Sequence, residues 1–250
     1  MNSFYSELAG CTVRWQELPG HGDPLVFIHG LGCASSYEYP RIVCDPQFAG
    51  RRAILIDLPG SGYSDKPHAF SYHTSAQAQV VIALLDALQL PAFWIYGHSM
   101  GGSIAIETAA LAGSRARGLI VSEPNFQAGG GQFSRGIAAQ TEEAFIRTGF
   151  PAMVEAETSR WKGCLQSSAP WAVWRGATSL VQGVEPSWGE IFTRLPIPVW
   201  LIFGALSLPD PDVDAMRQKG IRVKIIPDAG HSMSWENPSA LAKTLAECMG

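Results

Sequence analysis

The chain has 250 residues, of which 46% are hydrophobic and 16% are charged, and its net charge is -4. This composition predicts a globular protein with one large core and room for an inserted subdomain, and it excludes a disordered or fibrous chain. Because the charge is modest and no run of lysine or arginine occurs, nucleic acid and membrane surfaces are poor candidate partners.

Cysteine usage and the first residues bear on the cellular compartment. The five cysteines are widely spaced without a CxxC pair, and the amino-terminal residues show no signal-peptide pattern. We therefore expect free thiols and a cytoplasmic protein, since structural disulfides are rare in reducing compartments. No apolar run approaches the length of a membrane span, and no His, Cys, Asp or Glu cluster has metal-ligand spacing. The sequence predicts no metal and no other cofactor.

Short apolar runs alternate with helix-like segments in the first half of the chain. This alternation is typical of an α/β protein with a mostly parallel sheet covered by helices. In chain order, we expect strands over 12–18, 25–28 and 53–56, a helix over 74–90, a strand over 93–96, a helix over 103–110 and a strand over 118–122. After an irregular stretch, strands are expected over 198–204 and 221–226, followed by a closing helix over 238–248.

The most informative stretch is Gly97-His98-Ser99-Met100-Gly101, which lies between an expected strand and an expected helix. A serine on a sharp strand-to-helix turn needs neighbours without a Cβ, because the helix passes close to the strand. Ser99 would stand exposed at the helix N-terminus, where the helix dipole favours developing negative charge. The pattern predicts a nucleophile elbow with Ser99 as the nucleophile.

Four ordered motifs show that the chain resembles the α/β-hydrolase superfamily along nearly its whole length. They are His29-Gly30-Leu31-Gly32, Asp57-Leu58-Pro59-Gly60-Ser61-Gly62-Tyr63-Ser64, the elbow with Gly102, and Asp228-Ala229-Gly230-His231. The resemblance implies a core domain formed by residues 1–123 and 197–250. Residues 124–196, where the strand pattern stops, fall where this family inserts a helical cap over the active site.

A serine hydroxyl is a poor nucleophile at neutral pH, so Ser99 needs a general base within hydrogen-bond reach. His231 is the candidate, since it follows the last apolar strand on a glycine-marked loop, as the histidine of the family does. His98 would point elsewhere from the turn, and His29 belongs to the oxyanion loop, which we expect it to hold in place.

The third member of the triad departs from the usual pattern. The family generally places an Asp a few residues after the penultimate strand, but the expected position holds Ser207. Two carboxylates are alternatives: Asp210, slightly downstream, and Glu123, directly after the strand that follows the elbow helix. We favour Glu123, because it emerges at the carboxyl edge of the sheet and Pro124 fixes its direction.

The resemblance also implies an oxyanion hole made of two backbone N–H groups. One belongs to Met100, the residue after the nucleophile, and the other to Leu31 in the loop after the first buried strand. The turn-rich segment 57–64 lacks the Lys and the following helix of a phosphate-binding loop, so we expect it to support the site structurally.

Only the expected cap bears on the substrate. Its candidate substrate-binding residues are Phe126, Phe133, Trp161, Trp171 and Trp174. Aromatic side chains there either line an apolar pocket for an acyl chain or ring, or fill a core of the cap itself.

From these residues we expect a serine hydrolase of a small to medium, largely apolar carboxylic ester, with a lactone or thioester as variants. Its partner is then a small-molecule substrate. The alternatives are a carbon–carbon bond hydrolase or a lyase with the same triad, and a ligand receptor that retains a vestigial hydrolase site.

Overall fold

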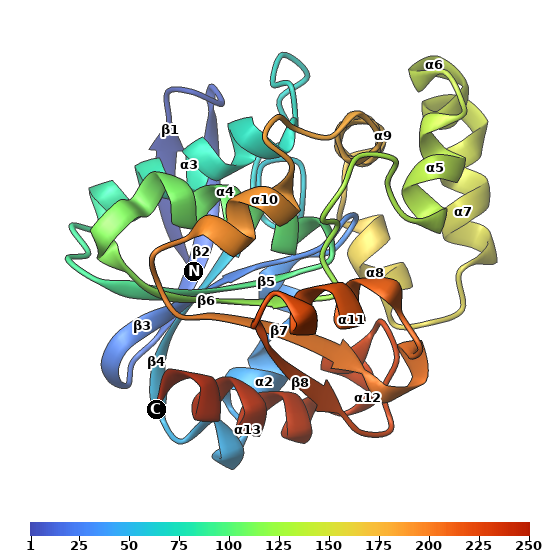
Figure 1. Cartoon of the computed structure of the whole chain (residues 1–250). Helices are drawn as coiled ribbons and strands as arrows, with labels where there is room; N and C mark the ends of the chain where they lie inside the picture. Colours follow the sequence, from blue (N-terminus) through green and yellow to red (C-terminus); the bar gives the residue numbers. More distant parts are fainter.

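A computed structural model describes all 250 residues, and its centre is an eight-stranded sheet (Figure 1). Along the sheet the strands run in the order β1 (Asn2–Ser6), β2 (Cys11–Leu18), β4 (Arg51–Asp57), β3 (His21–Ile28), β5 (Phe93–His98), β6 (Ala116–Ser122), β7 (Val199–Gly204) and β8 (Arg222–Ile226). The β1–β2 and β2–β4 pairs are antiparallel, whereas every other neighbouring pair is parallel. The expected α/β fold with a mostly parallel sheet is confirmed.

Alternate side chains of the central strands enter two apolar cores, one on each face of the sheet. In β3, Val26 and Ile28 belong to the larger core, whereas Leu25 and Phe27 belong to the smaller one. The larger core contains buried residues of α3 (Thr74–Ala87), α4 (Met100–Ala112) and α10 (Trp188–Arg194), and the smaller contains residues of α2 (Pro40–Val43) and α13 (Pro238–Met249). Both faces are therefore covered, which explains why the parallel strands are continuously apolar.

The segment between β6 and β7 is helical, and most of its helices gather beyond the carboxyl edge of the sheet (Figure 1). The helices are α5 (Gln132–Ala138), α6 (Glu142–Ala144), α7 (Phe150–Ala156), α8 (Trp161–Gln166), α9 (Pro170–Gln182) and α10. A small separate core joins α5, α9 and Phe145. The last helix, α10, instead packs on α4, where Trp188 is fully buried and donates from Nε1 to Oε1 of Glu107 at 2.8 Å.

Several short elements have no counterpart in the sequence expectations. Strand β1 is an edge strand whose residues are mostly exposed, so it lacks the apolar run by which buried strands are identified. The remaining short helices are α1 (Ser35–Glu38), α11 (Pro211–Gln218) and α12 (Met233–Glu236). All five cysteines are free, and none of the helices combines the length and apolar character needed to cross a lipid bilayer.

Candidate active site

Ser99 occupies the sharp turn between β5 and α4, with φ 54° and ψ -124°. A positive φ is strained for a residue with a Cβ, and such strain persists only where the surroundings enforce it. The glycines on either side permit the turn. A Cβ on Gly97 would lie 2.2 Å from the carbonyl oxygen of Gly101, and one on Gly101 would lie 2.3 Å from that of Ile28.

Glu123 and His231 meet at the carboxyl edge of the sheet. Nδ1 of His231 lies 2.7 Å from Oε2 of Glu123, and the N–H of Gly204 donates to Oε1 of Glu123 at 2.9 Å. Glu123 directly follows β6 and has a φ of 41°, so the chain bends sharply where its side chain leaves the strand. With Nδ1 donating to the carboxylate, Nε2 of His231 remains available to accept a proton.

The structure does not bring Asp210, the alternative acid, to His231. Oδ1 of Asp210 instead accepts from the N–H of Asp212 at 2.8 Å, which caps the N-terminus of α11. Ser207, which stands where the family usually has its acid, is among the groups that lower the pKa of Glu123. Of the two carboxylates left open by the sequence, only Glu123 contacts the histidine.

The environment of Glu123 keeps its carboxylate ionised. Burial raises its pKa, but hydrogen bonds from His231 and Gly204 together with the positive charge that His231 can carry outweigh burial, and the net shift of the pKa is downward. An ionised carboxylate at this position can orient the imidazole and stabilise its protonated form.

His98, next to Ser99, has a different environment. Its Nδ1 is hydrogen-bonded to Oγ of Ser122 at 2.9 Å, and the same hydroxyl meets the Tyr96 hydroxyl at 2.8 Å. Burial, followed by repulsion from His231, lowers the pKa of His98 to about 3. The ring centroids of His98 and His231 are 4.7 Å apart, so a neutral His98 forms one wall of the site beside the base.

The loop after β3 carries Leu31, and His29 holds this loop in place. The N–H of Leu58 donates to Nε2 of His29 at 3.0 Å, while Nδ1 of His29 is hydrogen-bonded to the carbonyl oxygen of Gly30 at 2.9 Å. Nearby, the buried carboxylate of Asp57 accepts from the N–H and hydroxyl of Ser36 and the N–H of Tyr63. These bonds agree with the expected supporting role of segment 57–64.

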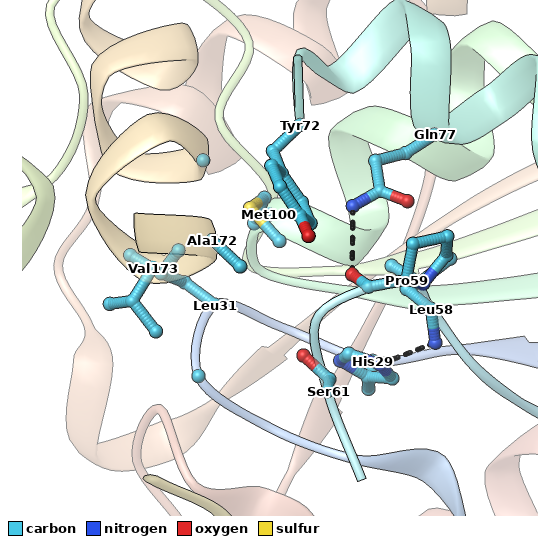
Figure 2. A pocket seen from close by; sticks show the side chains of 12 residues that line it. His29, Leu31, Leu58, Pro59, Ser61, Tyr72, Gln77, Met100, Ala172 and Val173 are labelled. Carbon is cyan, nitrogen blue, oxygen red and sulfur yellow. Dashed lines mark hydrogen bonds between the residues drawn. The ribbon is translucent and has the colours of Figure 1, made fainter. Parts of the chain in front are cut away.

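The backbone N–H groups of Leu31 and Met100 are free to bind an oxygen. The N–H of Leu31 donates no hydrogen bond within the chain, and Met100 is the first residue of α4, where an amide has no acceptor inside the helix. The side chains of Leu31 and Met100 both reach α9, where they lie beside Gly176. There they line a cavity of about 10 Å³ with Ala172 and Val173, which is too small for a substrate (Figure 2).

Ser99, His231 and Glu123 all line one larger cavity, with a volume of about 630 Å³. Two of the five cap aromatics expected at the substrate, Phe133 and Trp161, line it and contact each other edge to face. Nε1 of Trp161 also donates to the carbonyl oxygens of Leu31 and Gly32, so α8 is joined to the loop that follows β3. Phe203 and Trp235 line the cavity as well, although the sequence pattern did not single them out.

The other three expected aromatics lie outside the lining of this cavity. Phe126 is 2% exposed and packs against Phe192 in the main core. Trp171 stacks on His68, with ring centroids 3.7 Å apart. Trp174 packs against the small cap core, and its Nε1 donates to the carbonyl oxygen of Gln140 at 2.9 Å. These side chains fill cores, which was the alternative role for aromatics in a small helical cap.

No group of three or more His, Cys, Asp or Glu side chains is placed to hold a metal ion. The thiol nearest the site, Cys33, lines the large cavity, and a hydrogen bond with Cys164 together with burial raises its pKa well above the usual range. A thiol with a raised pKa is a poor nucleophile, so Cys33 is a weaker candidate for the nucleophile than Ser99.

A sequence model of the alpha/beta hydrolase family matches residues 25–244. The chain therefore belongs to this family. Two solved structures share its fold. An esterase from Exiguobacterium antarcticum superposes with a TM-score of 0.81 and 18% identity, covering 100% of this chain and 99% of that one. The N-acyl homoserine lactonase AidH superposes with a TM-score of 0.76 and 20% identity, covering 98% of this chain and 96% of that one.

Three curated relatives are similar in sequence. The dihydrolipoyllysine-residue acetyltransferase component of the acetoin cleaving system of Pseudomonas putida is 33% identical over 60% of this chain and 40% of the relative. The 2-hydroxymuconate semialdehyde hydrolase of Pseudomonas sp. strain CF600 is 33% identical over 41% of this chain and 36% of the relative. The putative 2-succinyl-6-hydroxy-2,4-cyclohexadiene-1-carboxylate synthase of Bacillus subtilis is 26% identical over 92% of both chains. The chain thus spans less than half the length of the first two relatives.

Proposed function

We propose that this hydrolase cleaves small to medium, largely apolar carboxylic esters through an acyl-enzyme formed on Ser99. The observation that carries the proposal is the 2.7 Å contact between His231 and Glu123, in the same cavity as a serine on a strained strand-to-helix turn. A nucleophile, a base and a group that orients the base are the three parts that acyl transfer by serine requires.

In the proposed mechanism, the hydroxyl of Ser99 attacks the ester carbonyl while Nε2 of His231 removes its proton. The ionised Glu123 stabilises the imidazolium that forms, and His231 then gives the proton to the leaving alcohol. Water, activated by the same histidine, hydrolyses the acyl-enzyme and restores the free serine. In acylation and again in hydrolysis of the acyl-enzyme, His231 takes up one proton and then passes it to the leaving group.

The backbone N–H groups of Leu31 and Met100 are proposed to bind the oxyanion of the tetrahedral intermediate. Met100 opens α4, so the positive end of the helix dipole adds to its N–H. Loss of one such donor typically costs about 10²–10³ in rate. Helices α5–α9 are proposed to act as the cap, since Phe133 and Trp161 line the cavity above Ser99.

The size of the cavity and the names of the relatives support a small-molecule substrate. A volume of about 630 Å³ lies within the usual range of roughly 300–1,000 Å³ for small-molecule sites. An esterase and a lactonase share the fold, which favours ester or lactone cleavage. The second candidate is hydrolysis of a non-ester substrate, because one relative is named a semialdehyde hydrolase.

A fluorophosphonate probe followed by a chain-length series of p-nitrophenyl esters tests the proposal. We expect the probe to label Ser99 and short esters to turn over, and Ser99→Ala to abolish both. Labelling without meaningful turnover of any ester or lactone would overturn the esterase assignment and favour a non-ester substrate or a ligand receptor. Ser103→Ala is the matched control, because Ser103 is buried in α4 and donates to the carbonyl oxygen of Asn125.

A further inference from the structure

The lining of the large cavity has a strong charge asymmetry. Its carboxyl side chains are those of Glu38, Glu123, Glu157, Asp210 and Asp212, and none of its lining residues is a lysine or an arginine. Only Glu123 among them forms an ion pair, which it makes with His231. The proposed mechanism uses Glu123 alone, so four carboxyl groups at the substrate have no role in the chemistry.

Glu38 is the most unusual of these four groups. Its side chain is 2% exposed, and its Oε1 accepts a hydrogen bond from the hydroxyl of Ser234 at 2.5 Å. Its Oε2 is buried and has no partner in hydrogen-bond geometry, although the thiol of Cys33 lies close enough to lower the pKa of Glu38. A buried acceptor without a partner is costly, so a ligand donor that reaches this oxygen gains a strong interaction. Burial raises the pKa of Glu38, and a nearby positive charge would favour its ionised form.

Asp210 and Asp212 form a second acidic wall, at the N-terminus of α11. Burial and the charge of Asp210 raise the pKa of Asp212, which is the response of two carboxylates held close together without a cation between them. Glu157 lies on the cap side, where hydrogen bonds from Ser159 lower its pKa and keep it charged. Acidic groups therefore surround the cavity from three different parts of the chain.

Three positive side chains lie near the cavity but outside its lining: Arg41, Arg160 and Lys162, whose charge helps to lower the pKa of Glu157. The guanidinium of Arg41 stacks on the ring of Trp235 at 3.7 Å, and that of Arg160 lies 5.9 Å from the same ring. Neither arginine forms an ion pair with a carboxylate of the cavity. The charge of Arg41 favours ionised Glu38. The space that a substrate occupies is thus bordered by carboxylates.

We propose that the cavity selects esters that carry a primary ammonium group over esters that carry a carboxylate, with Oε2 of Glu38 accepting a hydrogen bond from the ammonium. This inference rests on the proposed function, because ester cleavage by Ser99 provides the readout. The electrostatic field in a cleft lined by one sign of charge raises the association rate of oppositely charged substrates by about 10–10³-fold. Added salt weakens this field.

Three ethyl esters of matched acyl length test the proposal: the ester of heptanoic acid, the ester of aminohexanoic acid and the half ester of pimelic acid. They differ only in whether the acyl chain ends in a methyl, an ammonium or a carboxylate group. We expect kcat/KM to be about tenfold or more higher for the ammonium ester than for the carboxylate ester, and the ratio to shrink with salt. Equal values, or a faster carboxylate ester, would overturn the proposal.

Variants identify which carboxylates cause the preference for the ammonium ester over the carboxylate ester. Glu38→Gln and Asp212→Asn should each reduce the ratio several-fold, because each removes one carboxylate of the lining. Asp214→Asn is the matched control, since Asp214 lies on the same helix but its side chain is 73% exposed and outside the lining. An equal loss in Asp214→Asn would contradict the assignment.

A binding measurement separates failure of this proposal from failure of the proposed function. Trp161 and Trp235 line the cavity, so their fluorescence reports binding without any turnover. Hexylammonium should quench or shift this fluorescence at lower concentration than hexanoate, and Glu38→Gln should remove the difference. If no ester is cleaved but hexylammonium is preferred, only the proposed function fails. If the neutral ester is cleaved and hexanoate binds as well as hexylammonium, only the charge proposal fails.

Discussion

The catalytic edge of the sheet and the cap above it place their side chains in different ways. At the edge, Ser99 and Glu123 follow β5 and β6 directly, and both have a positive φ that fixes the direction of the side chain. In the cap, short helices carry the aromatic side chains, and the packing of each helix decides which ring meets the cavity. The backbone thus determines the site at the sheet edge, whereas side-chain packing determines it in the cap.

The prediction with the largest expected effect concerns Glu123, the proposed acid of the triad. Glu123→Gln should lower kcat by about 10³–10⁴-fold, because a neutral amide cannot stabilise the imidazolium and can hold His231 in the wrong tautomer. Asp210→Asn should change kcat for a neutral ester by less than about threefold, since Asp210 caps α11 and does not contact the histidine. Steady-state kinetics on one p-nitrophenyl ester measures both, and the reverse order of effects would refute the triad.

The second test concerns His98 at the same edge of the sheet and the way it makes the free energy of unfolding depend on pH. The pKa of His98 is lowered to about 3 in the folded protein, whereas an unfolded chain binds that proton near 6.5. As the pH falls below 6.5, the unfolded state binds a proton that the folded state does not, so the free energy of unfolding decreases. The loss approaches about 1.4 kcal/mol per pH unit and stops below the folded pKa.

His98→Asn removes this titration and can keep a hydrogen bond to Ser122. The difference in unfolding free energy between the wild type and the variant, measured with urea, should therefore shift in favour of the variant as the pH falls from 7 to 4. Parallel stability curves for the two proteins over this range would show that His98 is not held neutral by its environment.

The third test moves to the cap and asks whether it contributes to the chemistry. Trp161→Phe removes the Nε1 donor that joins α8 to the carbonyl oxygens of Leu31 and Gly32. The loop that carries the Leu31 N–H then loses a restraint worth about 1 kcal/mol, so we expect kcat to fall about five- to tenfold. Phe133→Leu is the control, because Phe133 lines the same cavity but makes no hydrogen bond to the loop. An equal fall in kcat for both variants would assign the effect to the apolar lining.

The sequence predicted the sheet edge well for a physical reason. Glycines at 97 and 101 are required by contacts of about 2 Å between a Cβ and the backbone, so they mark the turn in the sequence. The contact between Glu123 and His231 could be expected because Ser207 replaces the usual Asp and Glu123 follows a strand directly, whereas the role of Glu123 as the acid stays a proposal. The structure then adds a feature that no pattern indicated: the N–H of Gly204 donates to Oε1 of Glu123 and holds its carboxylate.

The same reasoning could not identify the residues that line the rest of the cavity. Phe126 and Phe133 lie seven residues apart, one before α5 and one in it, yet the first is buried in the core and the second is 62% exposed at the cavity. Glu38 and Trp235 belong to helices of four residues, which are too short for a period to show which side chain faces inward. Their positions depend on tertiary packing, which the local pattern of a single sequence does not predict.

The smallest expected effect therefore belongs to a cap aromatic that lies outside the cavity. Trp174→Phe removes the hydrogen bond from Nε1 to the carbonyl oxygen of Gln140 and leaves an aromatic ring in the cap core. We expect a loss of about 1 kcal/mol in the free energy of unfolding and a change of less than about twofold in kcat/KM. Urea unfolding and an ester chain-length series measure the two quantities. A change in chain-length preference, with stability unchanged, would mean that Trp174 reaches the substrate after all and that the cap closes further when a substrate is bound.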